Sequence, residues 1–289
     1  METITELQYG QYESVEQDDY SSRLFFDLHN SRLKLNQYQG NVDKVIKNTI
    51  DLCGKYGIGK ILATVRETDR QAFFDHGFVQ EAVIAGYFQG ETGYNVSFFY
   101  DQARAFSARI KEEDEIIAKA EEYWGQFSPL ENSEFIFRTG SREDAPDMAY
   151  LYDTVFKTYP TPMDNENYIS GVIQDDLVLF KVAEYDKRIV SAASAELNKE
   201  FFNAEITDCA TFMEFRGKGL LSELVYHLEN LLQEKKYVTL YSVARATSPG
   251  INIVFSKHGY EYTGRQINNS NIMGKLEDMN IWVKRLAVH

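Results

Sequence analysis

The chain has 289 residues, of which 44% are hydrophobic and 26% charged, the balance of a soluble globular protein with one large or two ordinary domains. Its formal net charge of −14 argues against general nucleic-acid binding, which needs lysine and arginine at the phosphates, and is compatible with a small cationic substrate. No apolar run approaches the roughly 20 residues that span a bilayer, and Cys53 and Cys209 lie in apolar contexts that fit a reducing compartment. We therefore expect a cytoplasmic protein that binds neither membranes nor nucleic acid.

The first part of the chain has the pattern of an N-terminal αβ domain, residues 21–127. The polar, acidic residues 1–20 before it predict a loose arm or an edge strand. Residues 102–126, rich in Ala, Glu and Lys, predict a linking helix. The other predicted elements are strand Leu24–His29, a helix after Asn41, strand Lys60–Val65, a short helix Arg70–Asp75, and strands Phe78–Gly86 and Asn95–Tyr100.

Residues 128–289 predict a second αβ domain, which begins near Ser128. A short strand leads to a helix whose first turn is capped at Ser141, and an antiparallel meander follows, because its alternating segments are joined by hairpin-length turns. The first predicted strand of this domain is Phe135–Arg138, and the meander has the predicted strands Leu177–Tyr185, Ile189–Leu197 and Phe202–Phe212. A glycine-rich turn and a helix follow the meander, and after them come the predicted strands Val238–Val243, Tyr260–Gln266 and Asn280–Arg285.

The glycine-rich turn, Arg216-Gly217-Lys218-Gly219, stands between the meander and an amphipathic helix. At such a place the free backbone N–H groups and the positive end of the helix dipole together bind phosphate. A dinucleotide fingerprint would put its glycines after a first parallel strand, and a P-loop would need Gly-Lys-Ser/Thr, so neither alternative fits.

A repeated sequence pattern, which we call the internal echo, links the two domains. Residues 60–78 and 237–260 both read as a strand followed by a helix that ends in His-Gly-aromatic, with more strands behind. The first domain is therefore interpreted as a truncated relative of the second, with coincidence as the rival explanation.

Residues 135–286 resemble the GNAT superfamily of N-acetyltransferases in the order of these elements. The family signature, Arg/Gln-x-x-Gly-x-Gly/Ala, appears here with leucine in place of the last small residue. The resemblance implies a GNAT acyltransferase fold, a mixed and mostly antiparallel sheet flanked by helices, preceded by a smaller GNAT-like αβ domain. It implies acetyl-coenzyme A as cosubstrate and no metal, and it assigns the diphosphate to Arg216, Gly217, Lys218, Gly219, Leu220 and Leu221 and the pantetheine arm to Ala210, Thr211 and Phe212.

By the same resemblance, Glu205 in the last meander strand takes the role of general base, because an attacking ammonium must first lose a proton. Asp208 is a second candidate, but residues three apart on an ideal strand point to opposite faces, so we expect only one of the two to reach the acceptor. Either carboxylate is also open to a purely structural interpretation. Where many GNAT enzymes have an acidic tyrosine this chain has Phe255, which leaves Tyr241, Tyr260, Tyr262 or no acid for that role.

A closer resemblance covers most of the chain. The segments YPTPMDNENYI (159–169), NAEITDCATFMEFRGKGL (203–220) and 250–282 are similar to the β-lysine N-acetyltransferases, which work with lysine 2,3-aminomutase. The resemblance implies acetylation of the ε-amine of β-lysine by direct transfer in a ternary complex. Polar residues are then needed around the acceptor, and the candidates are Tyr159, Asp164, Arg245, Asn268, Asn269 and Asn271, the asparagines lying in a predicted loop between two strands.

Several alternatives stay open at this point. Another small amine, such as lysine or a polyamine, or a protein amine fits the same signature, and Phe255 also allows a module that binds coenzyme A without turnover. The five histidines lack the spacing of metal ligands. The sequence leaves the oligomeric state open, a homodimer included.

Overall fold

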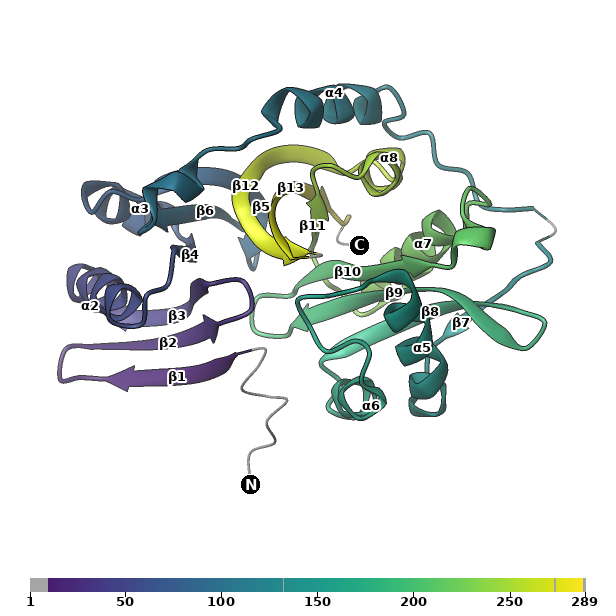
Figure 1. The fold of residues 1–289 in the computed structure, drawn as a ribbon, viewed down its shortest axis with the longest axis horizontal. Helices are drawn as coiled ribbons and strands as arrows, with labels where there is room; N and C mark the ends of the chain where they lie inside the picture. The colour runs from purple at the N-terminus through teal and green to yellow at the C-terminus, as the bar shows by residue number, and fades with distance from the viewer. Residues whose placement is uncertain (1–9, 132, 273, 288–289) are drawn as a thin grey trace.

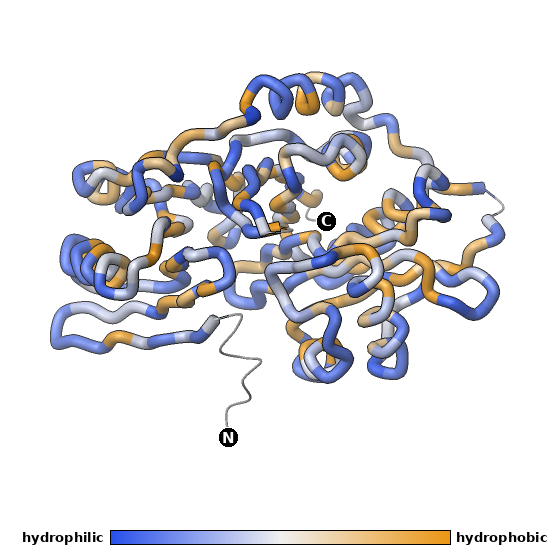
Figure 2. The backbone as a smooth tube through the Cα atoms, viewed as in Figure 1, coloured by the Kyte–Doolittle hydropathy of each residue, from blue (hydrophilic) through white to orange (hydrophobic). Residues whose placement is uncertain are grey.

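The computed structural model describes residues 10–131, 133–272 and 274–287, which form two β-sheets with helices packed on them (Figure 1). The predicted fold class, mixed and mostly antiparallel sheets flanked by helices, is confirmed. Hydrophobic residues concentrate in the strands, and most turns between them are hydrophilic (Figure 2). Among the described residues, no helix is both long and apolar enough to cross a membrane.

The N-terminal sheet has six strands in the order β1-β2-β3-β4-β6-β5, and only the β3–β4 pair is parallel. Helix α2 makes the crossover between those two strands, and its buried residues Val45, Ile46, Thr49 and Cys53 recur at helical spacing. The elements are β1 (Gln11–Glu16), β2 (Tyr20–Asp27), β3 (Arg32–Gly40), α2 (Val42–Lys55), β4 (Lys60–Val65), α3 (Glu67–Asp75), β5 (Val79–Phe88) and β6 (Glu91–Phe99).

The expected helix over residues 102–126 is wrong in extent, because the segment forms a 3-10 turn, η1 (Gln102–Ala105), and a shorter helix, α4 (Ile110–Glu121). The side-chain amide of Asn268 donates hydrogen bonds to the carbonyl oxygens of Arg104 and Phe106, at 2.9 Å each. A continuous helix would need those carbonyls for its own backbone bonds, so the contact with the second sheet interrupts it.

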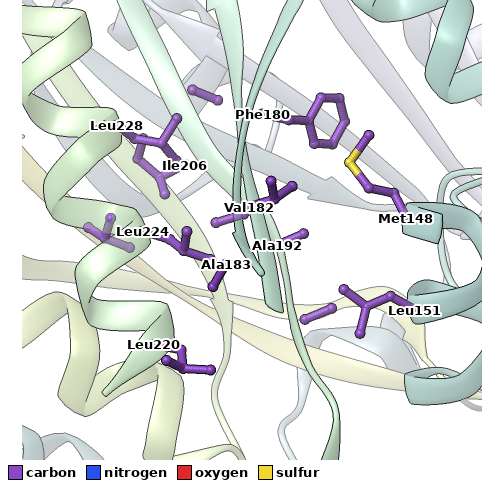
Figure 3. Packing of buried hydrophobic residues seen from close by; sticks show 14 of the residues in the cluster. Met148, Leu151, Phe180, Val182, Ala183, Ala192, Ile206, Leu220, Leu224 and Leu228 are labelled. Atoms are coloured by element: carbon purple, nitrogen blue, oxygen red, sulfur yellow. The ribbon is translucent and has the colours of Figure 1, made fainter. Parts of the chain in front are cut away.

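The C-terminal sheet has seven strands in the order β12-β13-β11-β10-β9-β8-β7, with a single parallel pair, β10–β11. Its elements are β7 (Ile136–Thr139), η2 (Arg142–Asp144), α5 (Ala145–Val155), α6 (Glu166–Gln174), β8 (Val178–Tyr185), β9 (Arg188–Asn198), β10 (Asn203–Thr211), η3 (Met213–Phe215), α7 (Leu220–Glu234), β11 (Thr239–Arg245), α8 (Pro249–Lys257), β12 (Glu261–Ile272) and β13 (Lys275–Arg285). Helix α7 packs its leucines on one face of this sheet and α5 packs Met148 and Leu151 on the other (Figure 3).

The two sheets share one topology. Strands β1, β2 and β3, crossover helix α2, β4, α3, β5 and β6 correspond in order and pairing to β8, β9, β10, α7, β11, α8, β12 and β13. The C-terminal sheet adds β7 and the helices α5 and α6. The echo between residues 60–78 and 237–260 therefore lies within a correspondence that extends over the whole N-terminal sheet.

The sheets meet where β5 lies against β12 and β13. Ala82 and Ile84 pack there against Ile281 and Val283. The strands approach so closely at Gly264 that a Cβ atom would lie 2.1 Å from the carbonyl oxygen of Glu81. A buried ion pair of the first half, Lys60 with Glu81 at 2.8 Å, also contacts the second half, since the Lys60 ammonium donates to the carbonyl oxygen of Ile267 at 2.8 Å.

Two elements, strand β3 and helix α6, were not predicted. The predicted loop between two strands is wrong, because residues 266–272 belong to strand β12. The asparagine-rich segment is extended because its backbone pairs with β13 and its side chains find partners on the N-terminal half, a tertiary effect that local turn preferences do not include.

Candidate active site

A single cavity of about 1570 Å³ runs from the glycine-rich turn, across the end of strand β10, to the inner surface of the N-terminal sheet. Its walls come from β3 and β4 of the first half and from β10, β11, α7 and α8 of the second. A ligand at the β10 end of this cavity would therefore be enclosed by both halves of the chain.

The cavity exists at β10 because this strand separates from its neighbour. Strand β10 pairs with β11 only over Asn203–Glu205, whereas its pairing with β9 continues to Thr211. The backbone of Phe212 still donates to the carbonyl oxygen of Val190 on β9, at 3.1 Å. Alternate residues of a strand point their N–H groups to opposite neighbours, so Thr211 directs its N–H toward the gap. The gap thus offers an extended ligand one strand edge to pair with.

A β-bulge decides how the two candidate carboxylates are arranged. The β9–β10 register shifts between Thr207 and Ala210, and Asp208 adopts a left-handed conformation with φ of 47°. The extra residue changes the alternation, so Glu205 and Asp208 lie on the same face and both line the cavity. The expectation that they point to opposite faces is wrong, because it assumed an unbroken strand.

The electrostatic surroundings of Glu205 favour its neutral form. Burial, and then the negative charge of Glu196 on the neighbouring strand, raise the pKa of Glu205 to about 8, while Lys34 opposes the shift. Glu196 and Glu205 are direct cross-strand partners. A carboxyl group with its pKa near physiological pH can exchange a proton with a ligand, which is the property a general base needs.

Asp208 is held more firmly. Burial and the charge of Glu196 raise the pKa of Asp208 to about 7, and hydrogen bonds from Ser194 and Tyr159 oppose the shift. The Ser194 hydroxyl donates to the Asp208 carboxylate at 2.6 Å, and the Tyr152 hydroxyl donates to its backbone oxygen at 2.6 Å. These contacts orient Asp208 as a fixed acceptor at the wall of the cavity.

The glycine-rich turn opens helix α7. Gly217 and Gly219 have φ of 78° and 80°, a region that other residues enter at a cost, and Gly219 is the N-cap of α7 without a side-chain cap. The first N–H groups of the helix are therefore left for a ligand. Arg216, Gly217, Gly219, Leu220 and Leu221 line the cavity, and Arg216 also donates to the carbonyl oxygen of Thr211 at 3.2 Å.

Three of the residues assigned to the cosubstrate lie outside the cavity wall. Ala210 and Phe212 are buried, and the exposed Lys218 lies 3.6 Å from Glu134 and over the ring of Phe135. Only Thr211 of the proposed pantetheine segment lines the cavity. The turn and the strand gap still provide free amides at two separated places, which fits a long ligand with a diphosphate group.

The structure separates the predicted acceptor residues. Tyr159, Arg245 and Asn269 line the cavity, but Arg245 is held by two hydrogen bonds to Glu277, at 2.7 and 2.9 Å. Asn268 and Asn271 instead bind backbone oxygens of the N-terminal half, and Asp164 is exposed outside the cavity lining. Their position follows from the extended form of β12, which turns most of the asparagines toward the first sheet.

The candidates for the acid also differ in position. Phe255 is fully buried against Tyr260, itself fully buried, and Tyr262 lies outside the cavity lining. Tyr241 lines the cavity on β11, opposite Glu205 in the parallel ladder. Burial and that carboxylate raise the pKa of Tyr241 well above its usual value.

Sequence reasoning missed the contribution of the N-terminal half, of which Arg32 and Lys34 on β3 line the cavity, and missed Glu196 on β9. The alternation Arg32-Leu33-Lys34-Leu35 is a signal for a strand with one charged face, and it was available. Nothing local shows which half of the chain that face would meet. The described residues contain no group of three or more His, Cys, Asp or Glu placed to hold a metal ion.

The chain is similar to a known protein family and to three proteins of known name. The profile of the Acetyltransferase (GNAT) family matches residues 143–260. The chain is 31% identical to the beta-lysine N(6)-acetyltransferase of Methanococcus maripaludis over 255 residues, 88% of this chain and 93% of the relative. It is 34% identical to the beta-lysine N(6)-acetyltransferase of Methanosarcina mazei over 81% of this chain and 94% of the relative, and 33% identical to N-acetyltransferase YodP of Bacillus subtilis over 94% and 99%.

Proposed function

The chain belongs to the GNAT family of acetyltransferases, and from this premise we propose that it transfers the acetyl group of acetyl-coenzyme A to the ε-amine of β-lysine. The observation that carries the proposal is the position of Glu205. It stands in one cavity with the glycine-rich turn at one end and with charged residues suited to a small amino acid at the other.

The residues of the turn and of β10 fit acetyl-coenzyme A. The N–H groups of Leu220 and Leu221 would hold the diphosphate, and the N–H of Thr211 would pair with the pantetheine arm in the strand gap. This cosubstrate supplies an acetyl group activated as a thioester. The gap ends at Glu205, where β10 and β11 begin to pair, so an extended arm leads to the carboxylate.

We assign the role of general base to Glu205. An ammonium has no lone pair, so the acceptor must pass a proton to Glu205, or to a water that it holds, before its nitrogen can bond to the acetyl carbon. The carbon–sulfur bond then breaks, the thiolate leaves with the electron pair, and the second proton that the nitrogen loses neutralises this thiolate to the free thiol. Of the three tyrosines considered as the acid, Tyr241 is the one that lines the cavity, and it is the ladder partner of Glu205.

Direct transfer is favoured over a covalent enzyme intermediate. Cys209 also lines the cavity and is the nearest alternative nucleophile on β10. Burial and the charge of Asp208 raise the pKa of the Cys209 thiol far above its usual range, so little thiolate would form. A ternary complex with both substrates bound at once fits a cavity shared by both halves.

The assignment of β-lysine as acceptor is supported by the printed names of two relatives and by the charges of the site. β-Lysine carries two ammonium groups and one carboxylate, and the central wall of the cavity presents carboxylates at Glu196, Glu205 and Asp208 with a cation at Lys34. Carboxylates that lie near a cation are the complement of a molecule with two ammonium groups and one carboxylate.

The test is an acceptor panel. The protein is incubated with acetyl-coenzyme A and, separately, with β-lysine, lysine and spermidine, while release of the free thiol is followed. The proposal expects the highest kcat/KM for β-lysine. Faster acetylation of lysine or spermidine would reject β-lysine as the acceptor, and binding of the cosubstrate with no thiol release for any amine would show a binding module.

A further inference from the structure

We propose that Lys34, on β3 of the N-terminal sheet, binds the carboxylate of the acceptor and so selects an amino acid over a polyamine. The inference rests on the proposed function, because it concerns the acceptor end of the same cavity. It gives the N-terminal half a role in recognising the acceptor, in addition to its role as a wall.

The strand places Lys34 in the cavity. Leu33 and Leu35 are buried in the N-terminal core, so the alternate residues Arg32 and Lys34 face the other way, toward β10. Lys34 lines the cavity together with Glu196 and Glu205. Its charge acts on Glu205, whose raised pKa it partly lowers, which puts the two side chains within electrostatic reach of one another.

Lys34 differs from Arg32 and Arg245 in having no carboxylate partner at salt-bridge distance among the described residues. Arg32 contacts Asp27 at 2.6 Å and donates to the carbonyl oxygen of Asn269, and Arg245 is held by Glu277. Among the described residues, no carboxylate oxygen lies within salt-bridge distance of the Lys34 ammonium. The Lys34 ammonium is partly buried and lies 5.9 Å from the centroid of the Phe25 ring, and a bound anion would add the charge partner that this contact does not supply.

The wall opposite Lys34 accounts for the other charges of the acceptor. Glu205 receives the ammonium that is to react, and Glu196, its cross-strand partner, faces the second ammonium. Asn269 also lines the cavity, and its buried Oδ1 has no hydrogen-bond partner among the described residues. A diamine without a carboxylate would satisfy the acidic wall and leave Lys34 unpaired.

The experiment removes each side of the proposed contact in turn. Wild type and Lys34→Met are compared with β-lysine and with 1,4-diaminopentane, which is β-lysine without its carboxylate. Loss of a hydrogen bond between charged groups should lower kcat/KM of the wild type roughly 10- to 100-fold when the carboxylate is removed. Lys34→Met should show that loss with β-lysine and little further loss with the diamine, and Lys34→Arg should recover part of it.

Two controls separate the contact from other effects. Lys44→Met makes the same change on the exposed surface of α2, where Lys44 pairs with Asp19, and should leave both substrates unaffected. Arg23→Met tests a second cation of the cavity lining that, like Lys34, has no carboxylate partner at salt-bridge distance among the described residues. The thermal midpoint of each variant shows whether it is folded.

The outcomes are distinct. If Lys34→Met slows β-lysine and the diamine equally and displaces the pH profile, Lys34 acts only on Glu205 and the proposal is wrong. If Arg23→Met carries the discrimination, the carboxylate is bound there instead. If wild type does not acetylate β-lysine at all but discriminates between lysine and cadaverine through Lys34, carboxylate recognition stands and the choice of β-lysine fails.

Discussion

The two halves of this chain have the same strand order but differ in the residue that caps the start of the crossover helix. In the N-terminal half, the side chain of Asn41 caps α2 and accepts the N–H of Lys44 at 3.2 Å. In the C-terminal half, Gly219 takes the cap position of α7 in a left-handed conformation and provides no side chain. One helix start is closed by its own residue and the other has no side-chain cap, so we expect a phosphate to bind at the second start and not at the first.

The halves differ again where their parallel strands meet. The third pair of the ladder is Lys34 with Leu62 in the first half and Glu205 with Tyr241 in the second. Positions that match in topology therefore carry opposite charges, and both side chains line the same cavity. Under the roles proposed for Glu205 and Lys34, the second half would perform the chemistry and the first half would contribute recognition.

The largest effect on the reaction rate is expected from a substitution of Glu205, the charged ladder residue of the second half. Glu205→Gln keeps the shape but cannot accept a proton, so kcat should fall about 10²- to 10⁴-fold. The carboxyl must be ionised to act, and its pKa is raised to about 8, so the wild-type rate should rise with pH through that value and then level off.

Initial rates of thiol release between pH 6 and pH 10 check this prediction. The glutamine variant should lose the limb near pH 8 and keep its affinity for coenzyme A. An unchanged rate and an unchanged limb would remove Glu205 as the base.

The second effect concerns the open helix start. Gly219→Ala places a Cβ on a residue with φ of 80°, which costs about 1 kcal/mol and disturbs the amides that face the diphosphate. The KM for acetyl-coenzyme A should rise about tenfold, the size expected for one charge-assisted hydrogen bond.

Gly57→Ala is the matched control for the glycine turn. Gly57 has φ of 64° and open space around it, but it lies outside the cavity lining. Both variants should lose similar stability, and only the first should lose affinity for the cosubstrate. Equal KM values for the two would show that the turn does not hold the diphosphate.

The smallest effect is expected at the capped start of helix α2, in the first half. Asn41→Ala removes the cap of α2 and should lower the free energy of unfolding by about 1 kcal/mol. Denaturant unfolding measures the loss, and KM for acetyl-coenzyme A should stay at the wild-type value. A change in that KM would mean that the first half also takes part in binding the cosubstrate.

Much of the C-terminal half could be predicted from the sequence because its signals are local. The alternation of β8, β9 and β10, the glycines of the turn and the apolar stripe of α7 each lie within a short window. Glu205 was chosen by the resemblance of its strand to that of GNAT enzymes.

The remaining features depend on contacts between distant segments. The bulge that turns Asp208 to the face of Glu205 is a property of the β9–β10 register, and the partners of Asn268 and Asn271 come from residues more than 160 positions away. The role of Lys34 is likewise invisible before the two sheets are brought together. Local pattern gives the elements, and only their packing shows which residues share a cavity.

The most direct test of the account is a crystal structure with coenzyme A and β-lysine bound together. The account predicts the diphosphate at the N–H groups of Leu220 and Leu221, one amine beside Glu205 and the carboxylate at Lys34. An acceptor that makes no contact with the N-terminal sheet, or a diphosphate bound away from the glycine-rich turn, would contradict it.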